Sequence, residues 1–356
     1  MVATRSTKQK CLVTGGAGFL GKHLVDQLAG SGAYEVTVFD IRDTGDTRVM
    51  TIVGDLRDPI QVDKACEGLD VVFHCATAAP SAANVSNKRL MHDVNVKGTQ
   101  HIVDACIKHG VPKLVYTSSA SVVFEGRSLY NADESTPYAA RPMDYYTETK
   151  ILGEKAILAA NGKGKLATVA LRPSGIFGEG DPLLVPIAVE KAKQGKMKYI
   201  IGSGDNLMDY TYVGNVAQAH IQAGEALIPG SRIAGKAYFI SNDDPQPFWG
   251  FLGDVLEPLG YGRPRIHLPW LLIFIIAWLL ENIITPLLKP IKEIKPSEFT
   301  TQRVTIAACN RTFTCERAKK DFGYKPKVSV QEGLKRTVAA FQHLQAAPHP
   351  TKGKKA

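Results

Sequence analysis

The sequence predicts an α/β protein built on a doubly wound parallel sheet, and three observations support this. Short apolar runs of strand length alternate with helical segments through residues 10–178. The connections between them are short, and the apolar runs end in glycine-rich or polar turns. Because parallel strands need helical crossovers, this alternation predicts helices on both faces of the sheet.

The first predicted strand, residues 10–14, runs directly into a glycine-rich turn and then into a helix that ends near Ala29. Glycine recurs at every third position of the turn, between a strand and a helix. This spacing allows a tight turn, lets the backbone approach a pyrophosphate and lets the helix pack closely on the strand. The helix N-terminus then offers N–H groups to phosphates. The predicted phosphate-binding residues are Gly15, Gly18, Phe19, Leu20 and Gly21.

The second predicted strand, residues 34–40, ends in the acid Asp40. A carboxylate at this place accepts hydrogen bonds from the adenosine ribose hydroxyls and repels a 2′-phosphate. Asp40 therefore favours NAD over NADP, although an acid at a strand end can also simply begin a turn. Arg42 could pair with a 2′-phosphate, so NADP remains the alternative.

Further strands are predicted at residues 50–54, 71–76 and 113–118, with helices from about Ile60 and over residues 88–109. Ligands of such sheets bind outside the carboxyl ends of the strands. Residues just past two of these ends, and a polar residue inside the long helix, are therefore candidates for contacts with adenine and ribose. These candidates are Asp55, Leu56, Ala76, Thr77 and Asn95. Ordinary turn chemistry is the alternative for each strand end.

Three residues form the candidate catalytic group: Ser119, Tyr146 and Lys150. Tyr146 and Lys150 are four residues apart, which places them on one face of a helix. An ammonium beside a phenol favours the phenolate and is expected to lower the tyrosine pKa, which makes the tyrosine a general base. Ser119 follows the strand at residues 113–118 and can donate a hydrogen bond to a substrate oxygen. The chemistry predicted is oxidation of an alcohol.

The combination of the glycine turn, Asp40, Asp55, Ser119 and Tyr146-x-x-x-Lys150 resembles the extended short-chain dehydrogenase/reductase family. Residues 117–126, 144–152, 195–198 and 315–320 are most similar to its 3β-hydroxysteroid dehydrogenase branch, and there to the decarboxylating dehydrogenases of 4α-carboxysterols. Residues 209–216 resemble a segment that returns to the cofactor domain, with Gly214 where the family often has an acid. The resemblance implies that the nicotinamide side of the site includes Pro173, Gly175 and Ile176.

The resemblance implies a Rossmann-type NAD-binding domain at residues 10–178 and a smaller sterol-binding region at residues 179–345. The polar and basic composition of the two ends predicts a flexible start (1–9) and a disordered basic tail (346–356). The resemblance also implies a homodimer and contact with other enzymes of sterol C4 demethylation. The reaction implied is oxidation of a 3β-hydroxyl followed by loss of the 4α-carboxylate as carbon dioxide. Alternatives are a 3β-hydroxysteroid dehydrogenase/isomerase, a nucleotide-sugar epimerase or dehydratase, and a non-catalytic dinucleotide sensor.

Composition narrows the classes of protein further. The net charge is +9, but no basic patch with interleaved aromatic residues accompanies it, so nucleic acid is not predicted as a partner. The six cysteines lack CxxC spacing, which predicts free thiols rather than disulfides or a zinc site. No metal site is predicted.

Residues 268–288 form an apolar segment that is interrupted by Glu281 and flanked by basic residues. A buried core helix and a full membrane span are both open readings. A helix inserted in the cytosolic leaflet is preferred, because a single span would place the later residues on the wrong side. Together with the family resemblance, this predicts the cytosolic face of the endoplasmic reticulum membrane or a lipid-droplet surface. The tail ends Lys352-Gly-Lys354-Lys-Ala356, which resembles an endoplasmic-reticulum retrieval signal; a solvated end is the alternative.

Overall fold

A computed structural model describes residues 8–80, 84, 86–288 and 299–346. A seven-stranded sheet, parallel throughout, lies at its centre in the order β12–β7–β5–β4–β1–β2–β3. The strands are β1 (Gln9–Thr14), β2 (Tyr34–Asp40), β3 (Met50–Val53), β4 (Val71–His74), β5 (Lys113–Thr117), β7 (Ala167–Pro173) and β12 (Lys236–Ile240). The predicted doubly wound α/β fold is thus confirmed.

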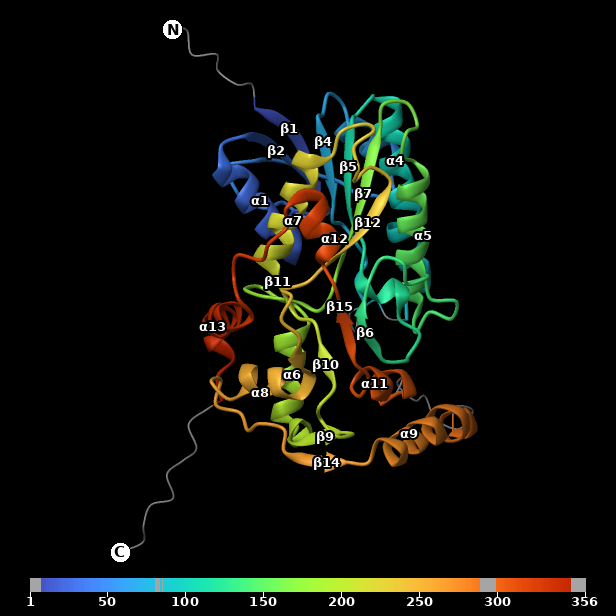
Figure 1. Cartoon of the computed structure of the whole chain (residues 1–356), viewed down its shortest axis with the longest axis vertical. Helices are drawn as coiled ribbons and strands as arrows, with labels where there is room; N and C mark the ends of the chain where they lie inside the picture. Colours follow the sequence, from blue (N-terminus) through green and yellow to red (C-terminus); the bar gives the residue numbers. More distant parts are fainter. Residues whose placement is uncertain (1–7, 81–83, 85, 289–298, 347–356) are drawn as a thin grey trace, which may run out of the picture.

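Helices cover both faces of this sheet (Figure 1). One face carries α4 and α5, and the other carries α1, α7 and α12. The helices are α1 (Phe19–Ser31), α2 (Pro59–Ala65), α3 (Lys88–His92), α4 (Thr99–Lys108), α5 (Tyr145–Ala159), α7 (Val213–Ala226) and α12 (Glu316–Phe322). Side chains alternate between the two faces: Val71 and Phe73 join one buried cluster, and Val72 joins the other. A strand buried on both sides must be apolar at successive positions, which is why these strands read as continuous apolar runs.

A smaller part lies below the sheet in Figure 1. Its four-stranded sheet has the order β13–β10–β15–β6, and β11–β8 and β14–β9 form separate pairs. The strands are β6 (Leu129–Ala132), β8 (Ile176–Phe177), β9 (Tyr199–Ile201), β10 (Leu207–Met208), β11 (Thr211–Tyr212), β13 (Gln246–Pro247), β14 (Ile266–Leu268) and β15 (Arg311–Phe313). The helices are α6 (Leu184–Lys193), α8 (Phe248–Leu256), α9 (Trp270–Leu279), α10 (Thr285–Leu288), α11 (Thr301–Ile306) and α13 (Val330–Ala340).

Two predicted elements differ in the structure. The helix expected over residues 88–109 contains a π-helical turn at Asp93–Gly98, between α3 and α4. Gly98 permits close packing at this turn, since a Cβ there would lie 2.9 Å from the Leu56 Cβ. The apolar segment expected from residue 268 begins its helix only at Trp270, because Leu268 belongs to β14.

The ends of the chain fall largely outside the described residues. The expected flexible start at 1–9 is described only from residue 8, and Gln9 already belongs to β1. In the expected tail at 346–356 only Ala346 is described, and its N–H donates to the Leu259 carbonyl. All six cysteines are free thiols, as predicted.

Candidate functional site

The register of the parallel strands brings the predicted site residues to one edge of the sheet. Thr14 pairs with His74, His74 with Tyr116, and Thr117 with Leu171. The ends of β1, β4, β5 and β7 therefore stand side by side. Residues that are more than 150 positions apart in the sequence share one carboxyl edge, where ligands of open α/β sheets bind.

The glycine turn has the geometry that its spacing predicts. Gly15 has φ +73°, which is the left-handed region that favours glycine. A Cβ on Gly21 would lie 2.0 Å from the Gly15 carbonyl oxygen, so only glycine fits where α1 meets the turn. Gly18 caps α1 without a side-chain hydrogen bond, and the first turn has no acidic residue. The N–H groups at the start of α1 can therefore donate to a phosphate, and the positive end of the helix dipole attracts it.

Asp40 lies at the end of β2 directly beside this turn. One of its oxygens accepts from the Ala17 N–H at 3.0 Å, and the other from the Arg42 N–H at 3.1 Å. The Arg42 side chain is exposed, and its Nη2 donates to the Ala17 carbonyl. The carboxylate is thus fixed at the edge of the turn, which is the position expected for a group that reads the ribose.

Asn95 joins the loop after β4 to helix α5. Its Oδ1 accepts from the Thr77 hydroxyl at 3.0 Å and from the Ala78 N–H at 2.7 Å. Its Nδ2 donates to the Thr149 hydroxyl at 3.0 Å, and that hydroxyl donates to the Tyr146 carbonyl. Asn95 lies in the π-helical turn and is 2% exposed. This explains why a mediocre helix former occupies a helix: its amide holds the tyrosine-bearing helix against the loop.

Tyr146 and Lys150 lie on successive turns of α5, and their surroundings differ from the sequence expectation. The Lys150 Nζ donates to the Thr117 carbonyl at 2.6 Å and lies 4.3 Å from the Tyr116 ring centroid. Burial lowers the pKa of Lys150 to about 7, against the opposing charge of Glu154. Burial and the charge of Asp144 raise the pKa of Tyr146 to about 12, although a Thr77 hydrogen bond lowers it. The expected net lowering of the tyrosine pKa is therefore wrong for this structure, because burial and the charge of Asp144 together raise it.

Ser119 follows β5 and caps the short 3₁₀ turn Ala120–Val123. Its hydroxyl lies 2.9 Å from the Ser121 hydroxyl and accepts from the Ser121 N–H. The structure thus places Ser119 at the same sheet edge as Lys150 and Tyr146. Among the described residues its hydroxyl contacts Ser121 and not Tyr146.

A buried ion pair supports this edge, and the sequence analysis missed it. Glu154, fully buried on α5, accepts from the Arg172 Nε at 3.1 Å and from Nη2 at 2.6 Å. The Tyr138 hydroxyl donates to the same carboxylate at 2.7 Å, and the Ser118 hydroxyl also donates to it. The network fixes α5 relative to β5 and β7. A glutamate one turn beyond Lys150 was the available signal, but nothing in the sequence marks Arg172 as its partner.

The remaining predicted cofactor residues at the strand ends differ in their contacts. Asp55 makes an ion pair with Arg57, which lowers its pKa. The Leu56 side chain is buried in the core, and its carbonyl accepts from His101. The Ala76 N–H donates to the Thr14 hydroxyl at 3.2 Å, beside the glycine turn.

The loop after β7 is fixed to the neighbouring segment. Pro173 ends β7, and Ile176 begins β8, where it pairs with Thr211. Gly175 has φ +48°, and a Cβ there would lie 2.7 Å from the Asp209 carbonyl oxygen. The Thr211 hydroxyl donates to the Ser174 carbonyl at 2.6 Å. Pro173, Gly175 and Ile176 are thus held at the end of β7, next to β5.

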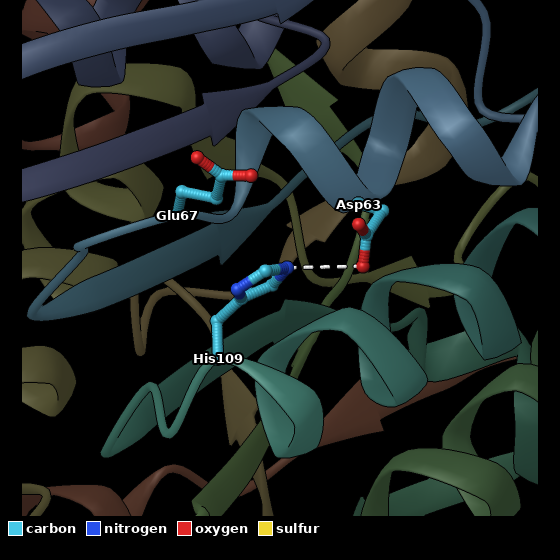
Figure 2. A group of neighbouring side chains, drawn as sticks. All are labelled: Asp63, Glu67 and His109. Carbon is cyan, nitrogen blue, oxygen red and sulfur yellow. Dashed lines mark hydrogen bonds and ion pairs between the residues drawn. The ribbon is translucent and has the colours of Figure 1, made fainter.

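A separate group of potential metal ligands lies far from this edge. Figure 2 shows Asp63 and Glu67 near the end of α2, and His109 after α4. The Lys108 ammonium contacts both Asp63 oxygens, at 2.7 and 2.8 Å, and His109 contacts one at 2.9 Å. Because the carboxylate is already neutralised by a cation, this group is better explained as a surface ion-pair network.

The apolar segment presents a large exposed apolar surface. Trp270–Leu288 is long and apolar enough to cross a membrane, with a mean hydropathy of 2.2, and 11% of it is buried. Only one side packs on the body: Ile273 and Ala277 meet Val304 of α11. Glu281 also faces the body, since its Oε2 accepts from the Thr301 N–H at 2.9 Å and from the Thr301 hydroxyl at 2.6 Å. The core-helix reading is therefore wrong. The flanking lysines 289, 292 and 295 lie outside the described residues.

Comparison with known proteins agrees with this fold. The family model described as "3-beta hydroxysteroid dehydrogenase/isomerase family" matches residues 12–270. A mouse sterol-4-alpha-carboxylate 3-dehydrogenase (decarboxylating) is 46% identical over 96% of this chain and 93% of its own length. An Arabidopsis thaliana 3beta-hydroxysteroid-dehydrogenase/decarboxylase is 44% identical over 97% of this chain and 82% of its own.

Among solved structures, the fold is similar to a Thermus thermophilus UDP-glucose 4-epimerase in complex with NAD. The TM-score is 0.70 and the identity 26%, over 94% of this chain and 99% of that one. The family match covers more than half of the chain and coincides with the glycine turn, Ser119, Tyr146 and Lys150. The chain belongs to the 3-beta hydroxysteroid dehydrogenase/isomerase family.

Proposed function

We propose that this protein oxidises the 3β-hydroxyl of a 4α-carboxysterol to a ketone, with loss of the carboxylate as carbon dioxide, in the C4 demethylation of sterol biosynthesis. The observation that carries the proposal is the likeness to sterol-4-alpha-carboxylate dehydrogenases along nearly the whole chain, at 46% identity. The gathering of Ser119, Tyr146 and Lys150 beside a glycine turn supports the oxidation chemistry.

We infer that the cofactor is NAD⁺, with NADP⁺ as the less favoured alternative. The first turn of α1 offers uncapped N–H groups for the pyrophosphate, and Asp40 stands where it would repel a 2′-phosphate. We assign cofactor binding to residues 10–178 and sterol binding to residues 179–345. Within the first of these, Asp55, the Leu56 backbone, Ala76, Thr77 and Asn95 would line the adenine and ribose side, and Pro173, Gly175 and Ile176 the nicotinamide side.

When bound, the nicotinamide would accept the hydride from carbon 3. Tyr146 as phenolate takes the hydroxyl proton, and Ser119 donates a hydrogen bond to the same oxygen. Lys150 supplies positive charge beside the tyrosine and the nicotinamide ribose. The product is a β-keto acid. Its bond from carbon 4 to the carboxylate breaks with the electrons passing into the ketone, so carbon dioxide leaves and the resulting enolate takes a proton.

Incubation of the purified protein with a 4α-carboxysterol and NAD⁺, followed by mass spectrometry, tests this proposal. We expect equal amounts of the decarboxylated 3-ketone and NADH. The family's description also covers isomerases, so a 3β-hydroxysteroid without a carboxylate should be assayed in parallel. A ketone from that steroid alone would move the protein to the isomerase branch, and NAD binding without turnover of either would favour a non-catalytic sensor.

We propose further that α9 and the turns after it insert into the cytosolic leaflet of the endoplasmic reticulum membrane or into a lipid-droplet surface. The exposed apolar side chains of this segment support insertion, and the attachment of Ile273, Ala277 and Glu281 to α11 favours a helix that stays beside the body rather than crossing. We also propose that the protein forms a homodimer and contacts other C4-demethylation enzymes, as the family resemblance implies.

A further inference from the structure

Arg311 is a cation without an anionic partner among the described residues. It lies on β15, is only partly accessible, and takes part in none of the ion pairs formed by the described residues. Its hydrogen bonds both come from Nη2, to the Ile306 carbonyl at 3.2 Å and the Met208 sulfur at 3.1 Å. Its Nε is buried and has no acceptor in the described part of the chain. The guanidinium also stacks over the Phe124 ring, 5.7 Å from the centroid.

A comparison with Arg172 shows how unusual this is. Arg172 is also buried, but its Nε and Nη2 donate to the Glu154 carboxylate at 3.1 and 2.6 Å. Burying a charge is costly unless hydrogen bonds and an opposite charge compensate it. Asp209 follows Met208, the strand partner of Arg311, but its carboxylate accepts from the Phe313 N–H and makes no ion pair with Arg311 among the described residues.

The surroundings of Arg311 connect it to the catalytic edge. Phe124 ends the 3₁₀ turn that Ser119 begins. The Met208 Cε lies 2.8 Å from where a Cβ on Gly175 would stand, so Met208 touches the loop after β7. Ile306 ends α11, whose Gln302 donates to the Asp144 carboxylate at the start of α5, 2.9 Å away. The guanidinium thus contacts the turn that begins at Ser119, Met208 connects it to the loop of Gly175, and α11 connects it to the start of the helix that carries Tyr146.

We propose that Arg311 binds the carboxylate of the sterol substrate and thereby makes the enzyme specific for carboxylated sterols. This inference rests on the proposed function and adds a residue to it. A planar guanidinium matches a carboxylate in a two-point contact, in which the unused Nε–H donates to one oxygen and Nη2 exchanges the Met208 sulfur for the other. The contact stabilises the bound carboxylate before it leaves, so it contributes to substrate affinity rather than to the rate of carbon dioxide loss.

The test uses the full-length protein with saturating NAD⁺ and two sterols that differ only at carbon 4: one carries a 4α-carboxylate and the other a 4α-methyl group. Dissociation constants are measured for both sterols with the wild type, Arg311→Met, Arg311→Lys and Arg89→Met. We expect Arg311→Met to weaken carboxysterol binding by about 10- to 100-fold, the range of a lost charge-assisted hydrogen bond. Affinity for the methyl sterol and for NAD⁺ should be retained.

Arg311→Lys keeps the charge without the planar fork, so an intermediate loss confined to the carboxysterol is expected. It decides the question if Arg311→Met does not fold. Arg89 is 94% exposed on α3, and Arg89→Met controls for the removal of one positive charge. An equal loss for both sterols, or no loss for either, would overturn the inference. Because binding is measured directly, a wild type that releases no carbon dioxide would refute the proposed reaction without hiding the role of Arg311.

Discussion

The carboxyl edge of the large sheet and the small sheet below it differ in whether a buried arginine is paired with a carboxylate. At the large sheet, Glu154 and Arg172 form a buried ion pair, and the Lys150 ammonium donates to the Thr117 carbonyl. At the small sheet, Arg311 has no carboxylate partner in the part of the chain that the structure describes, and the neighbouring helix α9 exposes a row of apolar side chains. In the first region, the buried arginine finds its carboxylate within the chain. The second has groups whose counterparts we assign to the sterol and the membrane.

This difference follows from what each region has to do. A catalytic edge must hold a few atoms in place, and a satisfied buried network does so because each member restrains its neighbours. A site for a large apolar acid needs a cationic side chain without an anionic partner, and apolar surface, before the ligand arrives. Substitutions in the first region should therefore reduce turnover or stability, and substitutions in the second should weaken the binding of sterol or membrane.

The largest effect is expected for Tyr146→Phe. Without the phenol oxygen no group in the proposed mechanism removes the hydroxyl proton, so turnover should fall by at least about 100- to 10,000-fold. Initial rates of NADH formation with a 4α-carboxysterol measure this, and NAD⁺ affinity should be nearly unchanged. Retention of substantial turnover would show that Tyr146 is not the base.

Glu154→Gln should come next, as a loss of stability. The substitution leaves the buried Arg172 guanidinium without its opposite charge, which costs about 3–5 kcal/mol in comparable buried pairs. Denaturant unfolding of both proteins measures the difference. Glu332→Gln is the matched control, because Glu332 pairs with Arg336 on the surface of α13 and should change stability little. Similar losses of stability in both variants would mean that burial does not determine how much an ion pair contributes to the free energy of unfolding.

A double substitution on α9, Leu271→Gln with Leu272→Gln, tests the openness of the second region. These side chains are 61% and 53% exposed, and their burial in a lipid interface is worth about 1.5 kcal/mol or more each. Partitioning onto phosphatidylcholine–phosphatidylserine vesicles should fall by about 100-fold. Ile60→Gln, on α2 beside the large sheet, is the control, since Ile60 is equally apolar and 77% exposed. Unchanged partitioning in the double variant would contradict insertion through α9.

The smallest effect concerns pH. Asp144 raises the pKa of Tyr146, so Asp144→Asn should lower it and increase the phenolate fraction at a given pH. The alkaline rise of kcat/KM should therefore move to lower pH. Asparagine can still cap α5 through the Thr147 N–H, which keeps the helix start intact. A profile that stays in place or moves to higher pH would show that the charge of Asp144 does not reach the tyrosine.

Local pattern was enough to predict the part of the molecule formed by consecutive residues. The glycine turn, the acid ending β2 and the Tyr146–Lys150 spacing each depend on neighbours in the chain, and the structure places all of them at one edge. The missed strand β12 shows the limit: Lys236–Ile240 joins the sheet beside β7, although it lies outside residues 10–178, where the strands of this sheet were expected. The pKa of Tyr146 was also beyond the sequence, since desolvation depends on everything packed around the ring.

By itself, the sequence determined the parallel sheet, the glycine turn, the Ser119, Tyr146 and Lys150 group that we propose as catalytic, and an apolar segment interrupted by one acid. The reason is that each of these is a short-range pattern of size, charge and polarity. The tertiary structure alone decided that Arg172 is paired while Arg311 is not. It also decided that Glu281 faces the body and that Asn95 braces the catalytic helix. Those outcomes depend on contacts between residues 18 to more than 100 positions apart, and such contacts exist only once the chain has folded.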